Sequence, residues 1–142
     1  MKTSENGISL IKRWEQFRRF PYQDSVGVWT QGYGHTRTTT INSKPINESQ
    51  ATQLLKSDLE QVEAFINAHF NLKQCQFDAL ASFLFNLGVN SLRNTHLYEL
   101  LLSDPESKNI ADEWIEFRNA GGEYLRGLMR RRIDEISMYY SW

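Results

Sequence analysis

Residues 11–36 read IKRWEQFRRFPYQDSVGVWTQGYGHT, and the chain changes its secondary structure within this stretch. Ile8, Ile11 and Trp14 recur at three-residue spacing, which predicts a helix that begins near Ser4 and runs into this stretch. Pro21 is expected to end this helix, because proline has no backbone N–H to donate. Three glycines then punctuate a run rich in Tyr, Val, Trp and Thr. This pattern predicts short antiparallel strands joined by tight turns over residues 22–36.

The rest of the chain has a helical pattern. Asn47 and Gln50 form the pattern of a capping box, which opens a helix of about 20 residues. Apolar spacing predicts a central core helix from Gln74 to a stop at Gly88. Further helices are expected over 91–102, 106–119 and 125–140, with a break at Gly121–Gly122.

These elements predict an α+β fold in one domain, residues 1–142. A small N-terminal lobe with a short antiparallel sheet is expected over about 18–50. A larger all-helical C-terminal lobe takes about 1–17 and 66–142, and a long helix over about 47–67 joins the two lobes. Clefts between such lobes are a favoured place for ligand sites.

Composition excludes several classes of function. Lys and Arg number 16 against 17 Asp and Glu, so the formal net charge is −1, which argues against nucleic-acid binding. The single cysteine, Cys75, allows neither an internal disulfide nor a multi-cysteine metal site, and we interpret it as a packing residue. The three histidines lack metal-ligand spacing. The sequence therefore predicts no metal site. No apolar run is long enough for a membrane span or a secretory signal, so the sequence also predicts no stable membrane insertion and no signal peptide.

Glu15 and Asp24 are two carboxyl groups in unlike surroundings. Glu15 falls near the C-terminal end of the first helix, where unpaired carbonyl groups favour a protonated acid; nearby arginines act in the opposite direction. Asp24 lies in a turn-rich, more solvated segment and is expected to stay ionised. Thr30 follows the next turn and can orient a water molecule. Paired carboxyl groups are the minimum equipment for glycoside hydrolysis, although a chain with 17 acidic residues contains many other pairs.

The same stretch resembles the glutamate–aspartate–threonine signature of phage-type lysozymes, the endolysin family classed as glycoside hydrolase family 24. The family places eight residues between its Glu and Asp and five between its Asp and Thr, and Glu15, Asp24 and Thr30 reproduce both spacings. The run YQDSVGVWTQGYGHT matches the family form aromatic–x–D–x–x–G–x–x–T–x–G–x–G–H. The resemblance continues through NESQATQLLKSDLE, QFDALASFLFNLG and the closing GG…GLMRRR segment, and so covers nearly the whole chain.

The resemblance implies a lysozyme that hydrolyses the β-1,4 bond between N-acetylmuramic acid and N-acetylglucosamine in peptidoglycan, with inversion and without a cofactor. Glu15 is then the general acid, and Asp24 and Thr30 hold the attacking water. The family pattern also implies that His35 pairs with Asp58 and so holds the small lobe on the long helix. The candidate substrate-binding residues are Tyr33, Gly34, Leu92, Gly121 and Gly122. The alternatives for these residues are core packing, turn geometry or a surface loop.

Gln16 departs from the family, which commonly has glycine directly after the catalytic glutamate. It supports an alternative function, a catalytically impaired carbohydrate-binding or scaffold protein with the same fold. A third hypothesis keeps the enzyme and changes the substrate to chitin. The basic run Arg130–Arg132 is interpreted as a solvated helix face, with contact to anionic groups of the cell wall as the alternative.

The family resemblance also implies where and with what the protein works. A monomeric phage or prophage lysis enzyme is expected to accumulate in the host cytoplasm until lysis. It would then reach the wall only after a holin-like partner has permeabilised the membrane.

Overall fold

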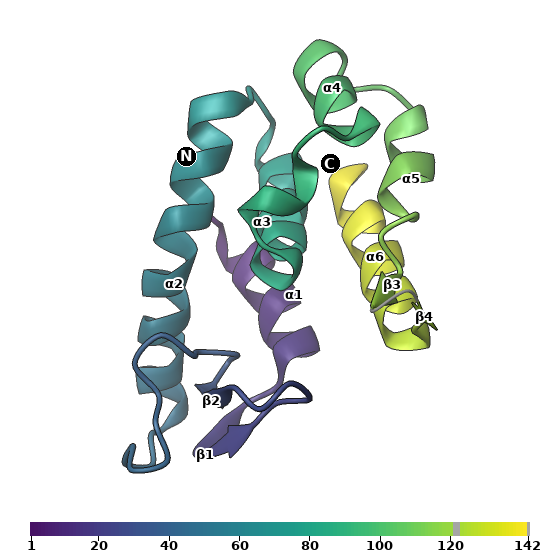
Figure 1. The fold of residues 1–142 in the computed structure, drawn as a ribbon. Coiled ribbons are helices and arrows are strands. Elements are labelled where there is room, and N and C mark those ends of the chain that lie inside the picture. The colour runs from purple at the N-terminus through teal and green to yellow at the C-terminus, as the bar shows by residue number, and fades with distance from the viewer. Residues whose placement is uncertain (121–122, 142) are drawn as a thin grey trace. The chain divides into compact units, whose positions relative to one another are not determined.

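The computed structural model describes residues 1–120 and 123–141. The described chain contains helices and antiparallel strand pairs, which confirms the predicted α+β class (Figure 1). The helices are α1 (Glu5–Glu15), α2 (Glu48–His69), α3 (Gln74–Leu87), the 3₁₀ helix η1 (Val89–Leu92), α4 (His96–Ser103), α5 (Asn109–Trp114) and α6 (Arg126–Tyr139), and the strands are β1 (Arg18–Gln23), β2 (Trp29–Gly32), β3 (Asn119–Ala120) and β4 (Glu123–Tyr124).

The chain divides into two compact units. A helical unit comprises Met1–Ile8 and Val62–Trp142, and a β-containing unit comprises Ser9–Gln61. Both boundaries fall inside helices, because α1 and α2 each contribute residues to both units. The bounds predicted from the sequence put residues 1–17 wholly in the larger lobe and end the small lobe at about residue 50.

In the β-containing unit, α1 ends six residues before the predicted stop at Pro21. Gln16 adopts φ +61°, a left-handed conformation that terminates a helix, and its N–H bonds to the carbonyl of Lys12 at 2.9 Å. Pro21 instead lies within β1, which pairs antiparallel with β2. The helix stop is therefore set by backbone conformation at a residue that carries no Gly or Pro signal.

The predicted capping box at the start of α2 is confirmed. Asn47 N–H donates to Gln50 Oε1 at 2.9 Å, and Gln50 N–H donates to Asn47 Oδ1 at 2.8 Å. Each side chain satisfies a backbone donor that the first helical turn leaves without an intrahelical partner.

In the helical unit, α3 is the predicted core helix. Residues 76–84 are all buried, and the helix ends at Gly88, whose φ of +89° suits glycine. It packs against α6 (Figure 1). The aromatic rings of Phe83 and Trp114 meet edge to face at 5.0 Å between centroids, and Trp114 meets Tyr139 at 5.3 Å. This aromatic cluster joins α3, α5 and α6.

Three predictions for the helical unit need correction. The single helix expected over 91–102 is two elements, η1 and α4, because Asn94 takes φ +59° and Thr95 then caps α4 by accepting from Tyr98 N–H at 3.1 Å. The helix expected over 106–119 ends at Trp114, and Arg132 binds the carbonyl of Phe117 at 3.4 Å. The β3–β4 pair adds strands to a lobe that was predicted to be all helical.

The basic run Arg130–Arg132 is not a solvated face. Arg130 is exposed, but Arg131 and Arg132 retain only 4% and 0% exposure. Both pair with Glu135, which is itself fully buried, because residues three and four apart share a helix face. Burial lowers the pKa of the Arg132 guanidinium, and the charge of Glu135 opposes that shift.

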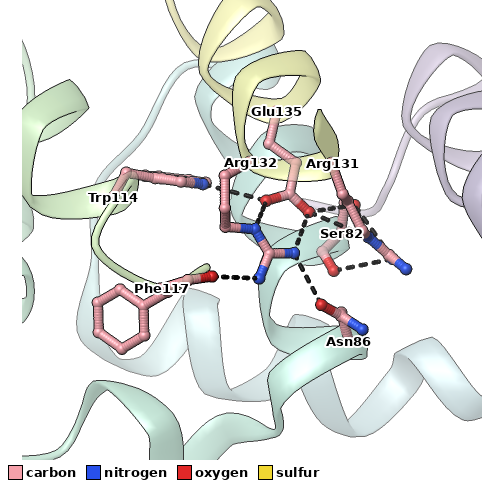
Figure 2. Close-up of polar contacts among 7 residues, drawn as sticks. All are labelled: Ser82, Asn86, Trp114, Phe117, Arg131, Arg132 and Glu135. Carbon is pink, nitrogen blue, oxygen red and sulfur yellow. Dashed lines mark hydrogen bonds and ion pairs between the residues drawn. The ribbon is translucent and has the colours of Figure 1, made fainter. Parts of the chain in front are cut away.

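Figure 2 shows how this network joins three elements. The Glu135 carboxylate accepts from Arg132 Nη2 at 3.0 Å, Ser82 Oγ at 2.6 Å and Trp114 Nε1 at 3.1 Å. Arg132 also donates to Asn86 Oδ1 at 2.9 Å. The network therefore ties α3 and the end of α5 to α6.

Candidate active site

Glu15 is the last residue of α1 and is half-buried. The position at a helix end is the predicted one, where the last carbonyl groups lack intrahelical partners. Gln16 then reverses the chain in its left-handed conformation, and β1 begins two residues later. The helix end and the turn together orient Glu15.

Asp24 directly follows β1 and forms a turn held by its own side chain. Its Oδ1 accepts from Val26 N–H at 3.0 Å and from Val28 N–H at 2.8 Å. Its backbone N–H donates to the carbonyl of Val28 at 2.9 Å, and its carbonyl accepts from Gly27 at 3.0 Å. Gly27 has φ +86°, which a residue with a side chain rarely adopts. The carboxylate is thus oriented by the backbone of its own turn.

Thr30 lies in β2 opposite Tyr22 and is only 4% exposed. Its Oγ1 donates to the carbonyl of Val28 at 2.9 Å. The peptide groups of Val28 therefore contact both candidate residues, with the N–H bound to Asp24 and the carbonyl bound to Thr30. The hairpin brings these two side chains to the same end of the strand pair.

The β1–β2 register contains an irregularity that bends β1. Arg18 pairs with Gly32 and Tyr22 with Thr30, so four steps along β1 oppose two steps along β2. Extra residues of this kind bend the strand that carries them. The bend lies between Glu15 and Asp24 in the sequence, in the segment that joins the two candidate carboxyl groups.

His35 and Asp58 are hydrogen-bonded, with 2.7 Å between Nδ1 and Oδ2, and His35 is 2% exposed. The backbone N–H of Thr38 donates to the other ring nitrogen, Nε2, at 3.4 Å. That bond makes Nε2 an acceptor and assigns the proton of a neutral ring to Nδ1, which donates it to Asp58. Arg37 also lies 3.5 Å from the Asp58 carboxylate. Asp58 thus links the segment after β2 to α2.

The candidate substrate-binding residues have different placements. Tyr33 is 6% exposed and packs against Phe17 at 5.8 Å between ring centroids, with Lys12 Nζ 5.3 Å from its ring centre. Burial raises the pKa of the Tyr33 phenol, and the charge of Glu48 adds to this. Tyr33 is thus largely covered by its neighbours in this structure, and its contact with a sugar stays a prediction.

The remaining candidates in this group lie in both units. Gly34 is half-buried with φ +74°, in the turn closed by two hydrogen bonds of 2.9 Å between the backbones of Gln31 and His35. Leu92, in η1, is fully buried, so its side chain is not presented to a ligand in this structure. Gly121 and Gly122 lie outside the described residues.

Sequence reasoning missed Gln31, which holds the hairpin to the following loop. Its Nε2 donates to the carbonyls of Arg19 at 3.0 Å and Lys44 at 2.6 Å, and the residue is 4% exposed. The only signal in the sequence is its place between Thr30 and Gly32 in a predicted strand. A polar residue there is expected to face solvent, so the pattern hides this role.

Within the described part of the chain, no group of three or more His, Cys, Asp or Glu side chains is arranged to hold a metal ion. None of the described helices combines the length and the hydropathy needed to cross a membrane. The thiol of Cys75 is half-buried and donates to the carbonyl of Ser141 at 2.9 Å.

The fold is that of phage lysozymes, and the chain belongs to the phage lysozyme family, whose model matches residues 12–135. It is 36% identical to an endolysin of Acyrthosiphon pisum secondary endosymbiont phage 1, over 99% of both chains. It is 37% identical to an endolysin of Salmonella phage P22, over 94% of this chain and 95% of that one. The structure matches the muramidase domain of SpmX from Asticaccaulis excentricus with a TM-score of 0.89 and 30% identity, covering 99% of both chains. The chain is thus a lysis enzyme of the glycoside hydrolase type that acts on peptidoglycan.

Proposed function

We propose that this chain is a muramidase that hydrolyses the β-1,4 bond between N-acetylmuramic acid and N-acetylglucosamine with inversion. The observation that carries the proposal is the pair of hydrogen bonds at Val28, whose N–H donates to Asp24 Oδ1 and whose carbonyl accepts from the Thr30 hydroxyl. Because that proton is donated to a carbonyl, Thr30 Oγ1 has lone pairs left to accept from a water molecule. Asp24 and Thr30 together are therefore suited to hold one water.

In this mechanism Glu15 donates its proton to the glycosidic oxygen as the bond from that oxygen to the anomeric carbon breaks. The water held by Asp24 and Thr30 attacks the anomeric carbon from the opposite face, and Asp24 accepts the proton that the water releases. One water is consumed, and the new reducing end has the inverted configuration. Inversion requires roughly 6.5–9.5 Å between the two carboxyl groups, so that the water fits between them.

Product analysis tests the bond and the stereochemistry. Purified walls are digested, the products are reduced with borohydride, and the reduced sugars are identified by mass spectrometry. We expect reduced N-acetylmuramic acid, and proton NMR of fresh products should show the α-anomer first. Reduced N-acetylglucosamine, or newly freed amino groups without new reducing ends, would contradict the proposed bond.

The alternative of a catalytically impaired carbohydrate-binding protein is supported by Gln16, which occupies a left-handed position without being glycine. That protein would sediment with purified walls and release no muropeptides. The chitin hypothesis is tested by incubation with chitin oligomers, whose hydrolysis at a rate equal to that of walls would favour it.

We also propose that the enzyme acts as a monomer and waits in the cytoplasm for a membrane-permeabilising partner. Lysis of expressing cells should then follow within minutes of adding a permeabilising agent and should not occur before it. Spontaneous lysis during expression would contradict this delivery route, and a dimer on size-exclusion chromatography would contradict the monomer.

A further inference from the structure

The helical unit contains a pocket that the candidate active site does not use. It encloses about 510 Å³ and is lined by residues from the C-terminal end of α2, from η1 and from α4. Ligand sites for small molecules enclose roughly 300–1,000 Å³. All its lining residues belong to the helical unit, whereas Glu15, Asp24 and Thr30 belong to the β-containing unit.

Aromatic side chains form part of the pocket lining. The rings of Phe65 and His69 stack with 4.3 Å between centroids, and Tyr98 meets His69 edge to face at 6.1 Å. Phe70, which is not a lining residue, packs edge to face on Tyr98 with 5.4 Å between ring centroids. Flat, supported aromatic side chains offer a large apolar surface at little cost in conformational entropy, which suits the apolar face of a sugar ring.

Polar groups among the lining residues are available to a ligand. Within the described part of the chain, no hydrogen bond engages the Tyr98 hydroxyl, the Asn94 amide or the Glu99 carboxylate. Arg93 donates one N–H to Asn90 Oδ1 at 3.1 Å and keeps other donors. The lining therefore offers both donors and acceptors, which the hydroxyl and acetamido groups of an N-acetylated sugar require.

The charges of the pocket argue for a neutral ligand. Arg93 and Glu99 both line it, so one positive and one negative group are present and neither sign dominates. A polyanion or a strongly cationic peptide would leave one of these groups facing a like charge. A neutral sugar with an acetamido group satisfies both.

We propose that this pocket is a second glycan-binding site, which takes N-acetylated sugars of the peptidoglycan strand. The proposal rests on the proposed function for the identity of the ligand. An enzyme whose substrate is an insoluble polymer gains from a second contact with the same strand, because the first contact raises the effective concentration of the second.

The test measures binding without turnover. The isotope-labelled full chain with Glu15→Gln is titrated with N-acetylglucosamine trimer, and the backbone amide shifts are followed by NMR. We expect one group of shifts in residues 89–99, with its own dissociation constant. Tyr98→Ala should weaken this binding about tenfold, since it removes the aromatic surface. Asn94→Gly should weaken it several-fold while retaining the left-handed backbone.

Asp112→Asn, an exposed substitution on α5 of the same unit, is the matched control and should leave these shifts unchanged. Shifts confined to residues around Asp24, or the absence of shifts, would each overturn the second site. Failure of the proposed function is detected separately, as the absence of muropeptides after digestion by the unmodified protein.

Discussion

Gln16 stands where the chain leaves α1, and its backbone conformation explains why the family prefers glycine there. Its φ of +61° costs free energy in any residue with a Cβ atom, and glycine removes that cost. The departure from the family pattern is therefore a matter of stability first.

Gln16→Gly should raise the free energy of unfolding by about 1 kcal/mol, because the left-handed conformation strains a residue that has a Cβ atom. The measurement is urea unfolding followed by circular dichroism. Gln16→Ala serves as the control, because it removes the side chain beyond Cβ and leaves the left-handed strain in place. Equal midpoints for the glycine and alanine variants would show that the strain is not the cause.

Thr30 offers a second prediction at the residue scale. Thr30→Val keeps the shape of the side chain and removes the hydroxyl that bonds to the Val28 carbonyl. We expect hydrolysis of walls to fall by about 10²-fold or more, since the attacking water loses a partner. Thr30→Ser keeps the hydroxyl and should retain most of the activity. A valine variant as active as the serine variant would remove Thr30 from the mechanism.

At the scale of elements, α6 depends on one buried carboxylate. Glu135 is the shared partner of Arg131 and Arg132, and it also accepts from Trp114 and Ser82. Glu135→Gln removes the carboxylate that pairs with the fully buried guanidinium of Arg132, which should cost about 3–5 kcal/mol of unfolding free energy.

Thermal unfolding of the Glu135→Gln variant measures this cost. Glu116→Gln is the matched control, because its carboxylate is 67% exposed and contacts Arg118 at 3.6 Å. The control should change stability by about 1 kcal/mol or less. A Glu135 variant as stable as the control would mean that the buried network does not hold the helices together.

The elements that the sequence predicted correctly are those whose signals are local. The capping box at Asn47 and the glycine stop at Gly88 act within one helical turn, and both are present. The end of α1 at Gln16 and the split at Asn94 carry no Gly or Pro, so the pattern continues through them. Burial of Arg132 depends on Asn86 and Phe117, which are distant in sequence.

In the candidate site, too, the features with a local sequence signal were predicted and the burial of side chains was not. The family spacing singled out Glu15, Asp24 and Thr30, and the hairpin places the last two beside one backbone group. The pattern gave no means of separating buried from open aromatic residues, so Tyr33 was weighed as a sugar platform although it is packed. The aromatic residues that line an open pocket, Phe65 and Tyr98, carry no motif.

At the scale of the whole molecule, stability should fall at alkaline pH. Burial raises the pKa of Tyr139, whose hydroxyl donates to the carbonyl of Pro105 at 2.7 Å. Because the folded state keeps this proton more tightly than the unfolded state, the contribution is complete below the unfolded pKa of about 10 and is lost as pH rises above it.

The free energy of unfolding should therefore decline from about pH 9 upward, and phenolate absorbance of Tyr139 should appear together with unfolding. Tyr139→Phe removes the titrating group, so its stability should depend less on pH in this range. A variant with the same alkaline decline as the parent would assign the effect to other groups.

The account depends most directly on Glu15 as the acid that protonates the leaving group. The decisive measurement is the rate at which purified walls lose turbidity with the parent, with Glu15→Gln and with Glu60→Gln, an exposed control on α2. We predict that the Glu60 variant matches the parent and that the Glu15 variant is slower by about 10²–10⁴-fold, with its fold intact by circular dichroism. Clearing by the Glu15 variant at the rate of the parent would contradict the mechanism.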